Sequence, residues 1–283
     1  MENKHIKMVG LDMDGTLLNS KKEIMPRTVE AVRKALDDGY EVVFSTGRSL
    51  SEVRQYLKLF PKMRYAILCS GAVVKDLRTG EDLKKAVVEF DTAKAVVKAA
   101  EGMEANILYF IGDEIYEAQS LRDKLEYYNC GGYRLLHETC ANWVEDPYAV
   151  MLKQPEDLVK INFYMHDEQE YRVLGERLEA MGVSHPSGSV FNYEISAAGV
   201  SKAEGLRCLC DHLGISIRQS IACGDEGNDY DMIQAAGLGI AMGNAIAPIK
   251  AIADTVVADC DHDGVAEAIE MYLGKPVRNL EEE

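Results

Sequence analysis

The chain alternates largely apolar runs with segments in which apolar residues recur at helical spacing. The runs at residues 8–11, 40–46 and 65–69 are each followed by small or polar residues, and helical patterns fill residues 25–39 and 49–59 between them. Apolar strands that alternate with helices are typical of a parallel sheet covered on both faces. The first part of the chain therefore predicts a parallel α/β sheet with helical crossovers.

The pattern changes near Lys84. From there to residue 191, apolar segments that predict strands and helical patterns follow one another without regular alternation. The expected strands are residues 87–90, 107–110, 114–116 and 161–165, and the expected helices are residues 92–104, 120–129 and 168–181. Most of the tyrosines and the only tryptophan also lie here. We interpret residues 86–191 as an α+β domain inserted into the first one.

The strand–helix alternation returns after residue 191. Ser201 is a good N-cap for a helix that runs through Leu213, and further short strands and helices follow it. We therefore expect a discontinuous core domain of residues 1–85 and 192–283, of the α/β class, with a Rossmann-like parallel sheet. The α+β insert would form a second domain.

Two aspartates, Asp12 and Asp14, follow the first predicted strand with one residue between them. Side chains two apart on a strand share a face, so the two carboxylates would repel each other and lose solvation. A cation between them would make this arrangement tolerable, and oxygen ligands favour a hard ion such as Mg2+. The other core strands end in Thr46-Gly47, Ser70-Gly71, Gly224-Asp225 and Gly243-Asn244. Because ligands bind at the carboxyl ends of strands in open α/β sheets, these residues predict one cleft.

The acidic loop at residues 224–231 has two interpretations. An EF-hand loop is excluded, because its sixth position needs glycine and here holds Tyr230. A metal site at the end of a strand fits better, with Asp225 as a direct ligand and Asn228 and Asp229 in support. The other interpretation is a solvated acidic loop before a helix, where the helix dipole favours carboxylates.

Lys202 lies at the predicted first turn of a helix, where the helix dipole disfavours a cation. Either its ammonium group points at an anion, or the side chain bends away into water. Carboxylates around a cation, a threonine, a lysine and amide-lined turns together describe a site for phosphoryl transfer, where catalysis is mostly positioning and charge neutralisation. A carboxylate nucleophile there would form an aspartyl-phosphate.

The net charge and the cysteine content of the chain exclude some classes of partner and location. The 283 residues carry a net charge of -16, which argues against a nucleic-acid partner and against an anionic membrane surface. The seven cysteines are odd in number, and we find no signal-peptide pattern and no apolar run as long as a membrane span. We therefore expect a cytoplasmic protein with free thiols.

Four motifs occur in order along the expected core. They are Asp12-Met13-Asp14-Gly15-Thr16-Leu17, Thr46-Gly47-Arg48, Gly199-Val200-Ser201-Lys202 and Gly224-Asp225-Glu226-Gly227-Asn228-Asp229. The chain thereby resembles the haloacid dehalogenase-like (HAD) superfamily, and within it the Cof-type phosphatases with a type IIB cap. The insert at residues 86–191 falls where that family has its cap domain.

The resemblance implies a Mg2+-dependent phosphatase that hydrolyses small phosphorylated metabolites, sugar phosphates first among them, through an aspartyl-phosphate. Asp12 would be the nucleophile. Asp14 would bind Mg2+ through its backbone carbonyl and act as acid and then as base, and Lys202 would neutralise Asp12 and a phosphoryl oxygen. The implied phosphate-binding residues are Thr46, Gly47, Lys202 and Asn228, and the implied metal ligands are Asp12, Asp14, Asp225 and Asp229.

Other functions stay open. Phosphohexomutase-like phosphoryl transfer would use the same groups, and a non-catalytic sugar-phosphate sensor could have lost them. A phospho-accepting receiver domain would have about half this length and no insert. One departure from the family is Ser70, where an asparagine is common, so its role is open. The substrate, its contacts in the insert and the formation of a homo-oligomer are also left open.

Overall fold

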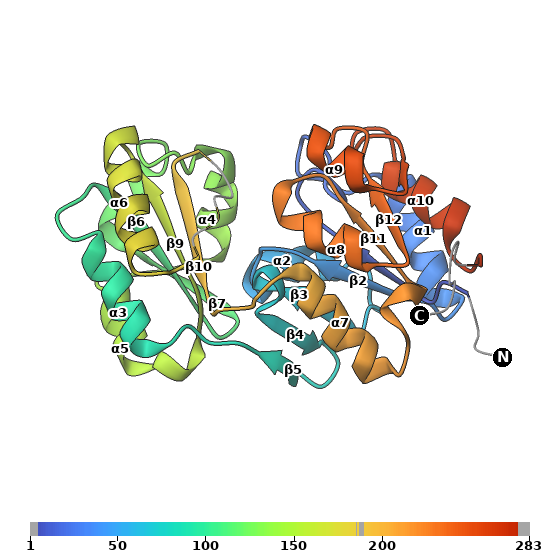
Figure 1. Ribbon diagram of the computed structural model, residues 1–283, viewed down its shortest axis with the longest axis horizontal. Helices are drawn as coiled ribbons and strands as arrows, with labels where there is room; N and C mark the ends of the chain where they lie inside the picture. Colours follow the sequence, from blue (N-terminus) through green and yellow to red (C-terminus); the bar gives the residue numbers. More distant parts are fainter. Residues whose placement is uncertain (1–4, 185, 187–189, 277–283) are drawn as a thin grey trace. The chain divides into compact units, whose positions relative to one another are not determined.

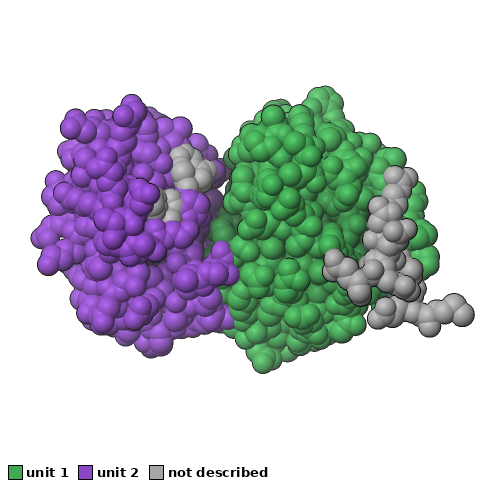
Figure 2. Space-filling model, in the orientation of Figure 1, with its two compact units in different colours: residues 1–48, 55–84, 201–283 green, residues 49–54, 85–200 purple. Residues whose placement is uncertain are grey.

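The computed structural model describes residues 5–184, 186 and 190–276 (Figure 1). The chain divides into two compact units (Figure 2). Unit 1 consists of residues 1–48, 55–84 and 201–283, and unit 2 consists of residues 49–54 and 85–200. The chain therefore passes between the two units four times, after residues 48, 54, 84 and 200.

Unit 1 is built on an eight-stranded sheet with the order β13-β12-β11-β1-β2-β3-β4-β5. The strands are β1 (Met8–Leu11), β2 (Glu41–Ser45), β3 (Tyr65–Leu68), β4 (Val73–Asp76), β5 (Asp82–Lys85), β11 (Ser220–Gly224), β12 (Leu238–Ala241) and β13 (Thr255–Val256). Pairing is parallel from β13 through β3, and β4 then returns antiparallel to β3. Both β1 and β11 are buried along their whole length, as expected for central strands with helices on both faces.

Helices alternate with the strands of unit 1. They are α1 (Pro26–Asp37), α2 (Leu50–Leu57, shared with unit 2), α7 (Lys202–Leu213), α8 (Tyr230–Ala235), α9 (Ala247–Ile252) and α10 (Gly264–Tyr272). Helix α7 begins at Lys202 because the Ser201 hydroxyl accepts a hydrogen bond of 3.2 Å from the Glu204 N–H. It ends at Gly214, whose φ of 65° lies in the left-handed region. The expectation of a Rossmann-like α/β fold is confirmed.

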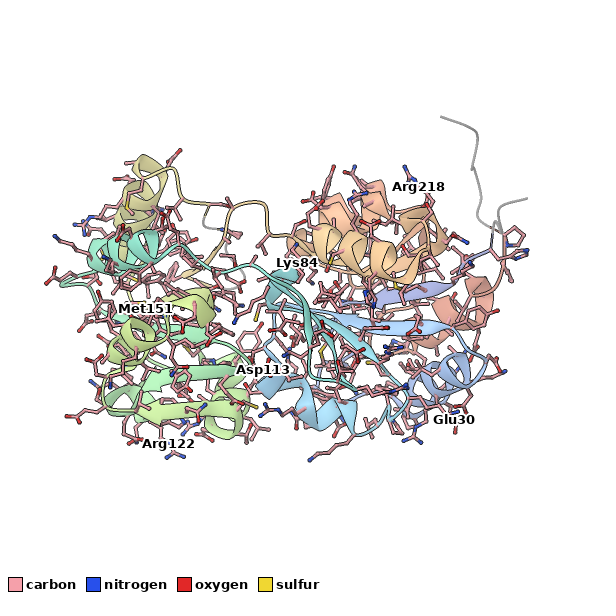
Figure 3. All side chains as sticks on the ribbon, turned by 90° about the horizontal axis from the view of Figure 1, so that it is seen from below. Glu30, Lys84, Asp113, Arg122, Met151 and Arg218 are labelled. Atoms are coloured by element: carbon pink, nitrogen blue, oxygen red, sulfur yellow. The ribbon has the colours of Figure 1, made fainter. Side chains whose placement is uncertain are left out.

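Unit 2 contains a five-stranded sheet with the order β10-β9-β6-β7-β8, antiparallel except for the β7–β8 pair. The strands are β6 (Ala105–Ile111), β7 (Glu114–Ala118), β8 (Ala141–Val144), β9 (Leu158–Met165) and β10 (Asn192–Ser196), and the helices are α3 (Phe90–Ala99), α4 (Arg134–Cys140), α5 (Pro147–Lys153) and α6 (Glu168–Ala180). Helices α3, α5 and α6 pack on one face of the sheet around an apolar core. Met151, labelled in Figure 3, is fully buried there, whereas Arg122 lies at the periphery.

Helix α4 lies on the other face of this sheet. Tyr116 packs against the apolar core, so the next residue on β7, Glu117, points to the opposite face. There Glu117 Oε1 lies 2.6 Å from Nδ1 of His137 on α4. None of the helices in the described part of the chain combines the length and the apolar character needed to cross a bilayer.

Two expectations for unit 2 are wrong. The strand expected at residues 87–90 does not form: the strand in this region is β5, and Phe90 begins α3. Val88 is instead a single buried apolar residue that packs in the core of unit 2. The helix expected at residues 120–129 is only a short 3-10 helix, Gln119–Lys124, followed by turns. A left-handed residue, Asn129 with φ 60°, ends that segment.

Gly205 tests the packing of α7 on the sheet of unit 1. A Cβ atom at this position would overlap Cγ2 of Ile67 on β3. Alanine would gain about 1 kcal/mol in helix propensity, but overpacking of a core typically costs about 1–3 kcal/mol. We expect Gly205→Ala to lower the free energy of unfolding by up to about 2 kcal/mol in urea titrations. Asp211→Ala on the exposed side of α7 is the control. If Gly205→Ala were as stable as this control, the Ile67 side chain would be able to move away from the added methyl group at little cost.

Candidate active site

Polar residues follow four neighbouring strands of unit 1 at one edge of the sheet. Asp12 follows β1, Thr46 follows β2, Asp225 follows β11, and Asn244 comes shortly after β12. These strands are adjacent and parallel, in the order β12-β11-β1-β2. Residues far apart in the sequence therefore gather where open α/β sheets bind their ligands.

Lys202 lies at the centre of this group and is only 1% exposed. Its ammonium group donates hydrogen bonds of 2.6 Å to Asp12 Oδ1 and of 2.6 Å to Asp229 Oδ1, and it lies 3.5 Å from Asn228 Oδ1. The two carboxylates explain why a lysine is found at the start of α7, where the helix dipole opposes it. The side chain does not bend away into water.

Asp229 also shapes the loop that follows β11. Its Oδ2 accepts hydrogen bonds from the backbone N–H groups of Asp225 (2.9 Å) and Glu226 (3.1 Å), and the side chain is fully buried. Gly224 precedes this loop, and a Cβ atom there would meet the Asp229 carboxylate within 3 Å. Asp229 thus fixes the direction of the Asp225 side chain as well as binding Lys202.

Asp225 is held from two further segments. Its Oδ1 accepts a hydrogen bond of 2.9 Å from Thr16 Oγ1, and its Oδ2 accepts one of 3.1 Å from Asn244 Nδ2. The same Asn244 amide donates to the Gly15 carbonyl at 2.8 Å. Gly15 has a φ of 80°, and a Cβ atom there would overlap the Asp225 carboxylate, so only glycine allows this close approach.

The carboxylates of Asp12, Asp225 and Asp229 form one buried cluster. Each offers an oxygen within 4.8 Å of the others. Burial, together with the charge of Asp229, raises the pKa of Asp12 well above its usual range, against the opposing effect of Lys202. Burial raises the pKa of Asp225 to about 7 against the hydrogen bond from Thr16, and the charge of Asp229 adds to the rise.

The charge of this cluster is not balanced by Lys202 alone. Burial would lower the pKa of Lys202, but Asp12 and Asp229 outweigh it and hold that pKa above its usual range, so the lysine stays charged. Three carboxylates and one ammonium group leave an excess of negative charge. The donors are all oxygens, which suits a hard divalent cation such as Mg2+ better than a thiolate-preferring or imidazole-preferring metal.

Asp14 lies in a different environment from Asp12, and its carboxylate is not part of the cluster. Arg48 donates from Nε to Oδ2 and from Nη2 to Oδ1, both at 2.8 Å, and Lys22 Nζ donates to Oδ1 at 2.8 Å. Burial would raise the pKa of Asp14, but Arg48 and then Lys22 outweigh it and lower that pKa to about 2. The two aspartates therefore have opposite pKa shifts although one residue separates them.

Thr46 and Gly47 form a tight turn after β2. Thr46 is buried and its Oγ1 accepts a hydrogen bond of 3.2 Å from the Arg48 N–H. A Cβ atom on Gly47 would lie 3.3 Å from Ser70 Oγ in the neighbouring turn. Ser70 has a φ of 57°, a left-handed conformation that asparagine adopts more readily than serine. The left-handed backbone conformation at position 70 therefore restricts the residue type there, independently of any polar role of the side chain.

Some residues of the site were not assigned a role from the sequence. Thr16 and Asn244 hold Asp225; the strand-end rule placed Asn244 in the cleft but did not predict this contact. Arg48 follows the Thr-Gly pair, but nothing in the spacing shows that it pairs with Asp14. Nothing in the sequence predicts the contact of Lys22 with Asp14, because this contact depends on the conformation of the turn that contains Lys22.

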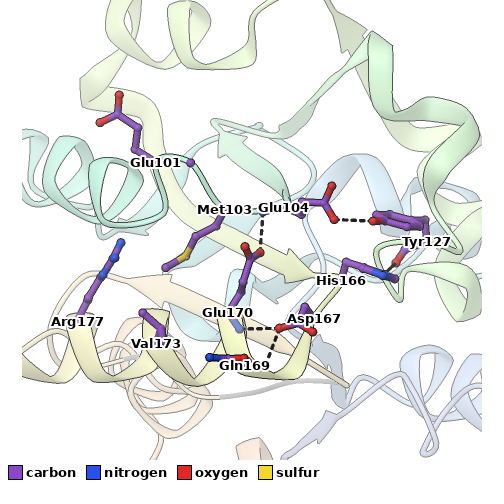
Figure 4. A pocket seen from close by; sticks show the side chains of 11 residues that line it. Glu101, Met103, Glu104, Tyr127, His166, Asp167, Gln169, Glu170, Val173 and Arg177 are labelled. Atoms are coloured by element: carbon purple, nitrogen blue, oxygen red, sulfur yellow. Dashed lines mark hydrogen bonds between the residues drawn. The ribbon is translucent and has the colours of Figure 1, made fainter.

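Unit 2 contains a separate pocket of about 680 Å³ between the turn after α3 and the start of α6 (Figure 4). Tyr127 stacks on His166 at its edge, with ring centroids 3.6 Å apart, and the Tyr127 hydroxyl donates to Glu104. Four carboxylates line this pocket against one arginine, Arg177. Such a lining disfavours a phosphorylated ligand.

Comparisons with known proteins agree with this geometry. A family model described as haloacid dehalogenase-like hydrolase matches residues 9–269. Phosphatase YwpJ of Bacillus subtilis is 31% identical over 287 aligned residues, which cover 95% of this chain and 100% of that protein. The 5-amino-6-(5-phospho-D-ribitylamino)uracil phosphatase YitU of the same organism is 29% identical, covering 94% and 97% of the two chains.

A solved structure is also similar over nearly the full length. The crystal structure of a haloacid dehalogenase-like hydrolase from Bacteroides thetaiotaomicron superposes with a TM-score of 0.82 and 26% identity. It covers 94% of this chain, and this chain covers 98% of it. The similarity therefore includes both units of the chain.

Replacing Lys202 tests the electrostatic centre of the site. In Lys202→Met, Asp12 and Asp229 would face each other in a buried place without their shared cation. Removing one partner of a buried ion pair typically costs about 3–5 kcal/mol, and we expect a loss of this size in chemical denaturation with chelator present. Lys34→Met, which removes an exposed pair with Asp38 on α1, should leave stability unchanged. Equal stability of the two variants would contradict the role given to Lys202.

Proposed function

The chain belongs to the haloacid dehalogenase-like hydrolase family and is a phosphatase of small phosphorylated metabolites, and we propose that it works with Mg2+ through a phosphoryl group carried on Asp12. The observation that carries the proposal is the arrangement of Asp12. Lys202 binds its Oδ1, whereas its Oδ2 accepts no hydrogen bond from the described residues. One oxygen is thus fixed and the other is available for attack.

In the first step, Asp12 Oδ2 attacks phosphorus and the bond from phosphorus to the leaving oxygen breaks. Lys202 favours the ionised nucleophile and neutralises charge on the phosphoryl group. The Thr46 hydroxyl and the Gly47 N–H bind phosphoryl oxygens from the turn after β2, with Asn228 nearby. Asp14 gives a proton to the leaving oxygen.

In the second step, water attacks phosphorus and the bond to Asp12 breaks, which releases phosphate. Asp14, now ionised, takes the proton from this water. In the substrate-free protein the low pKa of Asp14 keeps it ionised. An incoming phosphoryl dianion offsets the charges of Arg48 and Lys22 and raises the pKa again, so that Asp14 is able to carry the proton in the first step.

The oxygen donors of the buried cluster fit Mg2+. Asp12 and Asp225 would bind it directly, Asp14 would contribute its backbone carbonyl, and Asp229 would support the site by holding Lys202 and the loop after β11. When bound, Mg2+ supplies positive charge that stabilises Asp12 and the phosphoryl oxygens together.

We propose that unit 2 is a cap that selects the leaving group, and that sugar phosphates are the preferred substrates. YitU, as its name states, acts on a ribitylamino phosphate, which is a phosphate ester of a polyol chain. The domain limits expected from the sequence, residues 1–85 with 192–283 and residues 86–191, stay predictions. So do the cytoplasmic location and a homo-oligomer.

The Asp12→Asn variant tests the nucleophile. We expect phosphate release from sugar phosphates and from p-nitrophenyl phosphate to fall at least about a thousandfold, because the amide cannot form the phosphoryl intermediate. Asp231→Asn, an exposed position on α8, is the matched control and should keep wild-type rates. Similar rates for the two variants would contradict the mechanism.

Bound Mg2+ should stabilise the protein more at high pH than at low pH. A carboxyl whose pKa is raised on folding, like Asp225 at about 7, contributes stability below its unfolded pKa and loses it as the pH rises through the folded pKa. The metal needs the ionised form, so protons compete with it. The increase in Tm on adding Mg2+ should therefore be larger about one unit above pH 7 than about one unit below it. Asp225→Asn should lose most of this increase, and an increase independent of pH would contradict the site.

A further inference from the structure

The turn at residues 19–23 is closed by four hydrogen bonds. Asn19 Oδ1 accepts from the N–H groups of Lys21 and Glu23, both at 2.9 Å, and the backbone pairs Asn19 N–Glu23 O and Lys22 N–Asn19 O are both 2.9 Å. Within this turn Lys22 has a φ of 61°. A left-handed conformation is unfavourable for a residue with a Cβ atom. The turn therefore holds Lys22 in a conformation that it would not adopt alone.

Lys22 is fixed at both of its ends. Its carbonyl accepts a hydrogen bond of 3.1 Å from the Tyr56 hydroxyl on α2, and its ammonium group donates to Asp14 Oδ1 at 2.8 Å. The ring of Tyr56 in turn lies beneath the guanidinium of Arg48, 5.6 Å from centroid to Cζ. Lys22, Tyr56 and Arg48 thus form one connected group around Asp14.

The two oxygens of Asp14 are not equivalent in this group. Oδ1 accepts from both Arg48 Nη2 and Lys22 Nζ, whereas Oδ2 accepts only from Arg48 Nε among the described residues. Three donors fix the plane of the carboxylate. The second lone pair of Oδ2 remains available, so this oxygen is the one able to hold a proton that is passed to a substrate.

We propose that Lys22 is a positioning residue for Asp14, which orients Oδ2 for proton transfer to the leaving oxygen. The inference rests on the proposed function and deepens it. As the Asp12 Oδ2–phosphorus bond forms and the bond from phosphorus to the leaving oxygen breaks, the proton moves from Asp14 Oδ2 to that oxygen. Lys22 touches neither the phosphoryl group nor the leaving group in this step.

The leaving group decides how much this positioning matters. An alkoxide from a sugar phosphate is a strong base and leaves only when it is protonated. A p-nitrophenolate ion leaves without a proton, because the ring stabilises its charge. Loss of Lys22 should therefore affect alkyl phosphates and spare p-nitrophenyl phosphate. A variant that merely loosened the fold would affect both substrates alike.

The test measures kcat/KM with Mg2+ for glucose 6-phosphate and p-nitrophenyl phosphate, because this constant reports the steps up to release of the leaving group. In Lys22→Met we expect a fall of about ten- to a hundredfold for the sugar phosphate, within the range of general acid catalysis, and less than about threefold for the nitrophenyl ester. Lys22→Arg should restore most of the loss. The Lys22 side chain is 43% exposed, so the unfolding midpoint should not move.

Lys21→Met is the matched control, since Lys21 lies in the same turn and is exposed. It should leave both rates unchanged. An equal loss on both substrates, no loss, or a gain on the sugar phosphate in Lys22→Met would overturn the role of Lys22 while leaving the phosphatase intact. Absence of turnover by the wild type, or full turnover by Asp12→Asn, would instead overturn the proposed function and the inference with it.

Discussion

The site depends on one ammonium group shared by two buried carboxylates. Lys202 joins Asp12, which follows the central strand β1, to Asp229, which holds the loop after β11. The N-cap Ser201 sets where α7 begins, and this brings Lys202 to the edge of the sheet. Without this shared cation, the carboxylates of Asp12 and Asp229 would lie buried at short range without compensation.

The same edge gives two neighbouring aspartates different chemistry. Asp12 lies among other carboxylates, and burial raises its pKa, whereas Arg48 and Lys22 lower the pKa of Asp14 to about 2. Environments that separate the pKa values of two like groups are the usual basis for separate roles. In the proposed mechanism, Asp12 attacks phosphorus and Asp14 transfers the proton.

The sequence was most informative where a local rule applies. Apolar runs located the parallel strands of unit 1 but not β4 and β5. The rule on strand ends collected Asp12, Thr46 and Asp225, and Lys202 stood out because a helix start disfavours it. It was least informative where tertiary contacts decide. Lys22 reaches Asp14 from a turn in which it has a positive φ and its carbonyl accepts a hydrogen bond from Tyr56. The apolar residue Val88 packs in the core of unit 2 without belonging to a strand.

The most direct test of this account is to trap the phosphoryl enzyme. The wild type would be mixed with glucose 6-phosphate and Mg2+, quenched in acid during turnover and digested for mass spectrometry. We predict one added phosphoryl group on the peptide that contains Asp12, and none in Asp12→Asn. Turnover without any phosphorylated peptide, or a phosphoryl group on another residue, would contradict it.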